Sequence, residues 1–232
     1  MRPYVLEDAA LRLDQAGADD VATIAEYCQD PVFERFLTLP WPYSLGDARY
    51  FVDEYIPHGW DTGSEFTWAL RAGEGTPLLG IIGFRTARSD LGFWLGTPHR
   101  GRGLMPRAVR LVTGHILGAG LPGMTAIRWE CIFGNTASLA VARKCGFTFT
   151  GTKPAQVTAR DGSHPESWHA VLRLGDSPEP KPGWPAADNS TVGTTALGTT
   201  ALGTTALGTT APGTTALDTT ANTADNQGDV RP

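Results

Sequence analysis

Arginine and glycine alternate in one short segment of the sequence, a combination of residue types that can bind phosphate groups. The segment 95–106 contains Arg100-Gly101-Arg102-Gly103 at its centre. Glycine lets backbone N–H groups approach a ligand closely, and the N-terminus of a following helix adds partial positive charge. Each arginine can add charge-assisted hydrogen bonds worth about 1.5–3 kcal/mol. The segment suits a diphosphate, with an ordinary glycine-rich turn carrying two solvated arginines as the alternative.

The spacing excludes two common phosphate-binding loops. No Gly-Lys-Ser/Thr follows, as a Walker A loop requires, and the Gly-x-Gly-x-x-Gly of a dinucleotide-binding fold is absent. The loop still needs a strand before it and a helix after it. The apolar run 91–95 predicts the strand, while Pro106 and the apolar spacing of Val109, Val112 and Ile116 predict the helix.

Local signals predict the remaining elements around this loop. Ser44 with Asp47 forms a capping box, Asn135 suits the residue before a helix, and Gly146 suits a helix end. The predicted elements are strand 11–13, helices from 19 and from 44, strands 66–71, 78–84 and 91–95, a helix from 106, strand 126–131, helix 136–145, and strands 147–151 and 168–174. The order β-α-α-β-β-β-α-β-α-β-β predicts a mixed α/β domain around one sheet.

The composition changes sharply after Leu174. Residues 176–185 hold four prolines, and from Gly193 a Gly-Thr-Thr-Ala-Leu unit repeats with small variations. A period of five residues matches neither a helix nor a strand, so its leucines cannot share one face. We expect residues 1–175 to form the folded domain and 176–232 to be a disordered Pro-rich linker and repeat tail that catalysis does not need. A short repeat solenoid is the alternative.

Charge and composition exclude several classes of partner. The formal charge is −5, and the six acidic and two basic residues from Asp176 onward contribute −4 of it. The remainder is near neutral, which disfavours broad binding of nucleic acid. We expect a cytoplasmic protein, because the chain shows neither a signal peptide nor an apolar run long enough to span a membrane. Cys28, Cys131 and Cys145 are expected as reduced core thiols, and no metal site is predicted.

Two motifs together resemble the GNAT superfamily of N-acetyltransferases. Segment 100–105 resembles its Arg/Gln-x-x-Gly-x-Gly/Ala loop, and segment 135–147 resembles its Asn-x-x-Ser helix ending in Lys-x-Gly-Phe. Segments 40–44 and 166–168 look like the Rim-type branch, which acetylates the N-termini of ribosomal proteins. The resemblance spans about residues 10–174. It implies a central mixed, mainly antiparallel sheet flanked by helices.

The resemblance also implies that acetyl-CoA is the co-substrate. Its pyrophosphate would lie in the glycine loop and its pantetheine arm along the helix that begins at Asn135. The residues implied in binding are Leu95, Gly96, Thr97, Arg100, Gly101, Arg102, Gly103, Leu104, Met105, Asn135 and Ser138. Met105 stands where the family has a small residue, so its side chain must point away from the phosphates.

Amide formation from a thioester needs a polarised carbonyl, a neutral amine and a protonated leaving thiolate. The family leaves a backbone N–H free at the strand before the loop, which places this donor near Leu95 or Gly96. Ala142 replaces the tyrosine that the family often uses as the acid. The Rim-type resemblance implies Ser138 in that role, and simple packing of Ser138 in the helix is the alternative.

Glu130 and, from the resemblance, Glu166 are candidates for the base, with a solvated surface carboxylate as the alternative for each. An α-amine has a pKa of about 7.7–8.0, whereas lysine at about 10.4 is almost entirely charged at pH 7. A weakly basic acceptor is therefore favoured, either a peptide N-terminus or a small molecule. A longer acyl-CoA, or a CoA-sensing module without turnover, remains as an alternative function, and the chain is expected as a monomer or homodimer.

Overall fold

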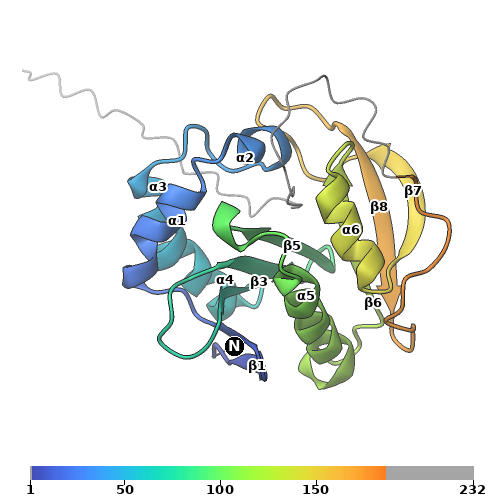
Figure 1. The fold of residues 1–232 in the computed structure, drawn as a ribbon, viewed down its shortest axis with the longest axis horizontal. Helices are drawn as coiled ribbons and strands as arrows, with labels where there is room; N and C mark the ends of the chain where they lie inside the picture. Colours follow the sequence, from blue (N-terminus) through green and yellow to red (C-terminus); the bar gives the residue numbers. More distant parts are fainter. Residues whose placement is uncertain (1, 187–232) are drawn as a thin grey trace, which may run out of the picture.

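An eight-stranded sheet runs through the domain with its strands in the order β1-β2-β3-β4-β5-β6-β8-β7 (Figure 1). The computed structural model describes residues 2–186, apart from the side chain of residue 119. Neighbouring strands are antiparallel, except that β5 and β6 are parallel and pair through Asp90 and Arg128. The strands are β1 (Leu6–Asp8), β2 (Leu11–Asp14), β3 (Glu65–Arg71), β4 (Gly80–Arg85), β5 (Asp90–Leu95), β6 (Ala126–Ile132), β7 (Thr148–Pro154) and β8 (Glu166–Arg173). The predicted mixed, mainly antiparallel sheet is confirmed.

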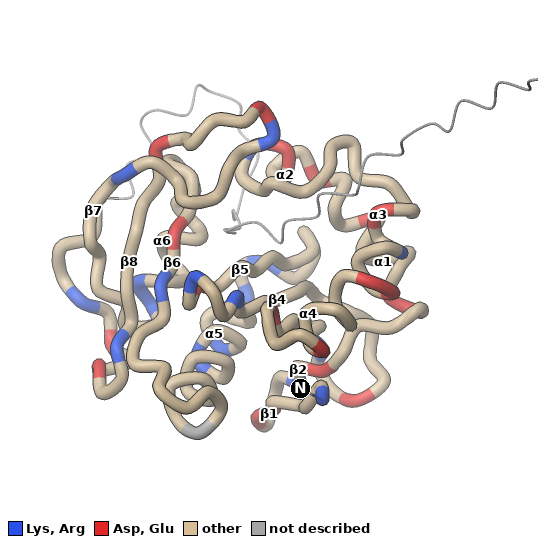
Figure 2. Tube along the Cα trace, turned by 180° about the vertical axis from the view of Figure 1, so that it is seen from behind, with Lys and Arg blue, Asp and Glu red and all other residues tan. Residues whose placement is uncertain are grey.

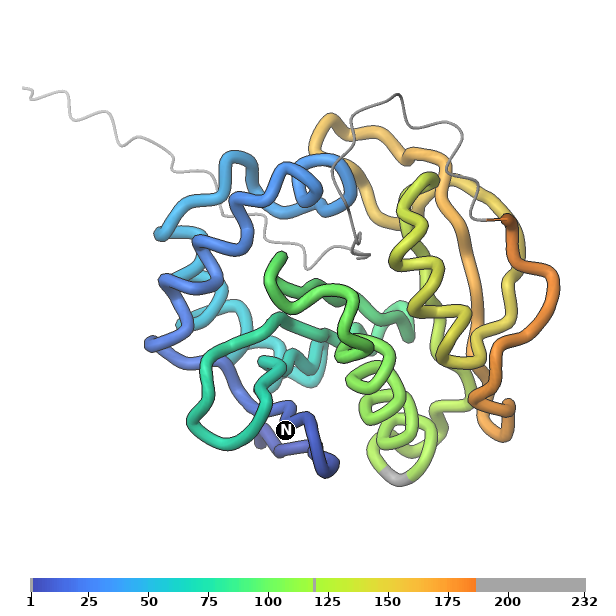
Figure 3. Tube along the Cα trace, viewed as in Figure 1, coloured from blue at the N-terminus to red at the C-terminus, as the bar shows by residue number. Residues whose placement is uncertain are grey.

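Helices cover both faces of this sheet. Helices α5 (Leu104–His115) and α6 (Thr136–Lys144) lie side by side on one face (Figure 3). On the other face α4 (Ile56–Thr62) packs against β3, as the view from behind shows (Figure 2). The other helical segments are η1 (Ala18–Asp20), α1 (Val21–Tyr27), α2 (Pro31–Phe36), α3 (Leu45–Tyr50), η2 (Phe51–Tyr55), η3 (Thr97–His99) and η4 (Ile116–Gly120). Within residues 2–186 no helix is both long and apolar enough to cross a membrane.

The predicted helix ends are confirmed by their hydrogen bonds. Ser44 Oγ accepts the N–H of Asp47 at 3.1 Å, while the Asp47 carboxylate accepts the N–H of Ser44 at 2.7 Å. Asn135 Oδ1 accepts the N–H of Ser138 at 3.2 Å, which caps α6. Gly146 follows α6 with a φ of 78°, the left-handed geometry expected there.

Three features of the N-terminal half differ from the prediction. Strand β1 adds a hairpin with β2, α2 is a separate short helix, and the predicted second helix continues through η2 and α4 to Thr62. Strand β1 has only three residues, too few for a periodicity to be recognised in the sequence. The additional helices lengthen the helical cover of the sheet. The order of the other strands along the chain is as predicted.

Residues 176–186 continue past the predicted domain boundary and lie against the domain. The ring of Trp184 contacts that of Trp129 at a centroid separation of 5.8 Å. Lys181 Nζ donates a hydrogen bond to Thr148 Oγ1 at 3.0 Å. Part of the predicted linker is therefore packed on β6 and β7.

Residues 187–232 of the predicted tail, which include the repeats, lie outside the described residues, so the two parts of the tail are tested separately. We expect truncation after Ala186 to leave the melting temperature unchanged. Truncation after Gly175 should lower the free energy of unfolding by about 1–3 kcal/mol, because it removes a packed tryptophan. Thermal unfolding of both shortened chains checks this, and Trp184→Phe in the full chain is the control that keeps an aromatic ring. Equal melting temperatures for the two truncations would show that residues 176–186 contribute nothing.

Candidate functional site

Strands β5 and β6 separate beyond the one pair that joins them, and the gap opens toward the loop that follows β5. A cavity of about 120 Å³ lies at this open end. Its walls come from the end of β5, the glycine loop, the start of α5 and one side of α6. The lining residues are Leu95, Arg100, Gly101, Gly103, Leu104, Met105, Pro106, Ala137, Ala140, Val141 and Lys144. Two segments that the sequence predicted as binding elements thus enclose one cavity.

The glycine loop presents its backbone to open space. Gly101 and Gly103 have φ values of 74° and 75°, a region that favours glycine. A Cβ added at Gly103 would meet no atom within 4 Å. Helix α5 begins at the next residue, so the unsatisfied N–H groups of its first turn are available beside the loop. Leu104 is partly buried, and the Met105 side chain is 2% exposed and belongs to the core.

Arg100, the first arginine of the loop, binds other residues of the domain through its side chain. Arg100 Nη2 lies 2.7 Å from Asp30 Oδ2, and Arg100 Nε donates to Leu95 O at 3.2 Å. The Thr97 hydroxyl donates to the same Asp30 oxygen at 2.7 Å. Arg102, in contrast, is exposed. Of the two arginines predicted to contact a diphosphate, Arg102 extends from the loop and Arg100 forms part of the wall.

Asp30 connects helix α2 to this loop. Its Oδ1 accepts the N–H of Val32 at 2.9 Å and so caps the helix, which begins at Pro31. Burial by itself raises the pKa of the Asp30 carboxyl, but the bonds from Val32, Thr97 and Arg100 outweigh burial and hold the pKa below its usual range. The sequence contained a signal for this residue, since Asp followed by Pro is a common helix start.

The hydrogen bonds at the end of β5 distinguish between the N–H groups of Leu95 and Gly96, the two predicted donors to the thioester carbonyl. The Gly96 N–H already donates to Leu79 O, on the β4 side, at 2.9 Å. Successive N–H groups of a strand point to opposite sides, so the Leu95 N–H is directed toward the gap beside β6. A Cβ added at Gly96 would lie 2.5 Å from the ring of Tyr27, so a larger residue here would require this ring to move.

Asn135 and Ser138 lie at the start of α6, where both are fully buried. Asn135 Nδ2 has no hydrogen-bond partner in the described part of the chain. Ser138 Oγ accepts a hydrogen bond from Trp129 Nε1 at 3.1 Å, so the hydroxyl faces β6. The cavity wall on α6 is formed instead by Ala137, Ala140, Val141 and Lys144.

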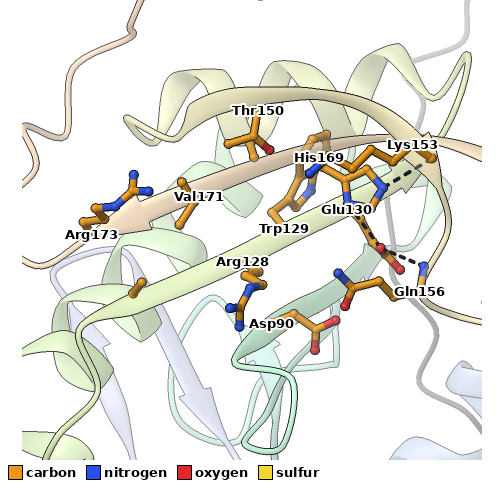
Figure 4. Close-up of a pocket in the computed structure, with 12 residues that line it drawn as sticks. Asp90, Arg128, Trp129, Glu130, Thr150, Lys153, Gln156, His169, Val171 and Arg173 are labelled. Atoms are coloured by element: carbon orange, nitrogen blue, oxygen red, sulfur yellow. Dashed lines mark hydrogen bonds and ion pairs between the residues drawn. The ribbon is translucent and has the colours of Figure 1, made fainter.

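The two carboxylates predicted as bases have different surroundings. Glu130 is 5% exposed and lies on the face of β6 opposite Trp129, as strand alternation predicted. Its carboxylate accepts the N–H groups of Gln156 and Val157 at 3.1 and 3.2 Å. His169 Nδ1 lies 3.5 Å away, and Figure 4 shows Gln156 and His169 beside Glu130. Glu166 is exposed and does not line the cavities beside Glu130.

Arg160 is a structural residue of the site that the sequence did not reveal. Its guanidinium donates to Leu37 O at 2.8 Å, to Leu39 O at 2.9 Å and to Glu34 O. These bonds fasten the 155–165 connection between β7 and β8 to the end of α2. Its partners are backbone carbonyls more than 120 residues away in the chain, and such partners leave no motif in a sequence.

Comparison with known families agrees with this geometry. The profile of the acetyltransferase (GNAT) domain matches residues 10–148. No curated protein sequence matches the chain.

Several solved structures share the fold at low sequence identity. The microcin self-immunity acetyltransferase MccE, in complex with acetyl-CoA and AMP, has a TM-score of 0.61 and 16% identity over 72% of this chain and 94% of its own. The ribosomal α-N-protein acetyltransferase RimL, in complex with coenzyme A, has a TM-score of 0.63 and 18% identity over 74% and 98%. An acetyltransferase from Salmonella typhimurium that modifies an N-terminal serine of a ribosomal protein has a TM-score of 0.62 and 18% identity over 74% and 99%.

The ion pair between Asp30 and Arg100 predicts a pH-dependent stability. Because the folded-state pKa of Asp30 is lowered, its charge stabilises the fold above the unfolded pKa of about 3.9, and this contribution is lost as the pH falls through the folded value. We expect Asp30→Asn, which can still cap α2, to lower the free energy of unfolding by about 1–3 kcal/mol at pH 7. Urea unfolding at pH 7, 5 and 3.5 measures this difference.

The difference between Asp30→Asn and the unchanged protein should shrink at pH 3.5. Asp61→Asn, at an exposed position of α4, is the control and should change little at any pH. A constant difference across the three pH values would contradict the role of the Asp30 charge.

Proposed function

Since the chain belongs to the acetyltransferase (GNAT) domain family, we propose that it transfers the acetyl group of acetyl-CoA to a primary amine. The observation that carries this proposal is the cavity enclosed by Leu95, the glycine loop and α6. An acceptor such as a peptide N-terminus or a weakly basic small molecule is supported by the similarity to RimL, a ribosomal α-N-protein acetyltransferase. The direct test is release of free thiol from acetyl-CoA in the presence of peptides and small amines.

The residues around the cavity fit acetyl-CoA. The backbone at Gly101 and Gly103, the first turn of α5 and the exposed Arg102 would hold the pyrophosphate, since all of them supply N–H donors or positive charge. The face of α6 that includes Ala137 and Val141 would line the pantetheine arm. Asn135 Nδ2, at the start of the same helix, is a buried donor without a partner in the described residues, but Asn135 does not line the cavity.

One backbone N–H of this chain would assist the attack of the amine on the thioester. The Leu95 N–H would polarise the thioester carbonyl and stabilise the negative charge that forms on its oxygen. The amine nitrogen attacks the carbonyl carbon, so a C–N bond forms, the C–S bond breaks and coenzyme A leaves as a thiolate that takes up a proton. The burial of Ser138 behind Trp129 favours its packing role. With a thiol pKa near 8.5, that proton can come from water or from the new ammonium group.

Glu130 is the better of the two candidates for the base. It is buried at the middle of β6, next to the gap, and its partners hold the carboxylate in one position. Glu166 is exposed at the start of β8, where water solvates it. A base needs to reach the ammonium proton directly or through one water, and only a fixed group near the gap meets that condition.

Gly103 tests the location of the pyrophosphate. We expect Gly103→Val to weaken acetyl-CoA binding at least about tenfold, because the branched side chain occupies the space beside the loop and blocks the backbone. Isothermal titration calorimetry measures the affinity. Gly123→Val is the matched control, since Gly123 also has a positive φ and open space beside it but lies outside the loop. An unchanged affinity in a folded Gly103→Val protein would contradict the proposed site.

The choice between the carboxylates is tested by paired amide substitutions. Glu130→Gln keeps the shape of the side chain but removes the proton acceptor, so kcat should fall about 100-fold or more with an acceptor that is largely protonated. Glu166→Gln should leave kcat within about twofold, because its side chain is solvated. Steady-state kinetics with acetyl-CoA at saturation measures both. Equal effects of the two substitutions would remove Glu130 from the mechanism.

A further inference from the structure

A second, larger cavity lies on the face of β6 and β8 that is opposite α6. It has a volume of about 280 Å³, close to the size of small-ligand pockets, and its lining is largely polar (Figure 4). Glu130 and Arg128 come from β6, while His169 and Arg173 come from β8. Glu130, the candidate base, thus lines this cavity and also lies beside the gap between β5 and β6.

The other cavity that Glu130 lines is too small for an acceptor. It measures about 20 Å³ and lies among α2, β6 and the 155–165 connection that Arg160 fastens in place. A volume of this size holds about one water molecule. Of these two cavities, the one on the back of β6 and β8 has room for an amine acceptor.

The carboxylates of the larger cavity already have partners. Asp90 accepts hydrogen bonds from Arg85 at 2.8 and 3.1 Å and lies 3.5 Å from Arg88. Glu130 accepts two backbone N–H groups and lies beside His169. Asp90 is thus paired with arginines, and both oxygens of Glu130 accept hydrogen bonds, before any ligand binds.

Two arginines at the other end of the cavity lack such compensation. In the register of β6 and β8, Arg128 faces Val171 and Arg173 faces Ala126, so the arginines are diagonal neighbours about 7–8 Å apart on one face. Both are exposed, and neither forms a salt bridge within residues 2–186. Arg128 donates only to the backbone carbonyl of Arg88. Asp176 acts on Arg173 electrostatically, but its carboxylate pairs with Lys181 at 2.9 Å.

We propose that this cavity binds the acceptor, and that the acceptor is a small primary amine that also carries a carboxylate or phosphate group. Arg128 and Arg173 bind the anionic group, and the amine lies toward Glu130. Arg128 and Glu130 are two residues apart on β6, so their Cα atoms are about 7 Å apart, and the acceptor separates its amine and anion by several bonds. The inference rests on the proposed function and adds a substrate class to it.

Matched pairs of probes test this substrate class. Glycylglycine is compared with its C-terminal amide, and 2-aminoethyl phosphate with ethanolamine, each titrated into the full chain saturated with coenzyme A so that the glycine loop is filled. Amide NMR resonances report the affinity and the place of binding. We expect each anionic probe to bind at least about tenfold more tightly than its neutral counterpart, with shifts centred on β6, β8 and residues 156–157. The pair with the larger ratio shows whether carboxylate or phosphate is preferred.

Substitution of the arginines tests whether they bind the anionic group. Arg128→Gln with Arg173→Gln should abolish the preference for the anionic probes and leave the neutral probes unchanged. Arg49→Gln, at an exposed position of α3, should keep the preference. Thermal unfolding confirms that these surface variants are folded.

Three results would overturn the inference: equal binding of charged and neutral probes, a preference that survives in the double variant, or no binding of any probe. The proposed function fails separately, through loss of coenzyme A binding in calorimetry or absence of thiol release with every amine. Coenzyme A binding and thiol release without a preference for anionic acceptors would therefore leave the proposed function in place and remove only the substrate class.

Discussion

The site depends on the way that two parallel strands meet once and then separate. Asp90 of β5 pairs with Arg128 of β6, and these residues end a register that crosses four strands, Glu65 to Arg85 to Asp90 to Arg128. The charges alternate along this row, and Arg85 binds Asp90 with both residues buried. Backbone pairing along this row joins the strands at one end, and within residues 2–186 Arg128 adds no ion pair to it, so the opening at the other end has a defined position.

The separation of β5 and β6 also divides the chemistry between two faces. Trp129 and Glu130 are adjacent in sequence, yet strand alternation places one against α6 and the other over the polar cavity. The α6 face carries the cap of Asn135 and the packing of Trp184 on Trp129, and the bond from Trp129 to Ser138 joins that helix to the sheet. The opposite face carries the fixed carboxylate and the two arginines. A ligand in the gap can therefore be approached from two sides by different groups.

Arg100 shows how a motif residue can contribute without direct contact to a ligand. Its ion pair with Asp30, its bond to Leu95 O and its place over the Phe33 ring fix the loop to the α1–α2 side of the domain. The same contacts position the backbone of Leu95, the proposed carbonyl donor. Since the side chain of Arg100 is only 7% exposed, the loss of its partner would leave a nearly buried charge unpaired. The ion pair thus links the shape of the glycine loop to the helices that cover the other part of the sheet.

The sequence by itself determined the features whose physical causes are local. The capping box at Ser44, the cap at Asn135 and the positive φ of Gly146 each depend on a few neighbouring residues, and periodicity located most strands and helices. The tertiary structure alone decided that Arg100 binds Asp30, that Glu130 is buried and Glu166 exposed, and that residues 176–186 pack on the domain. These outcomes depend on contacts between residues far apart in the chain, such as the hydroxyl of Thr97 and a carboxylate 67 residues before it. Such contacts form only when the sheet brings distant segments together, and no short pattern encodes them.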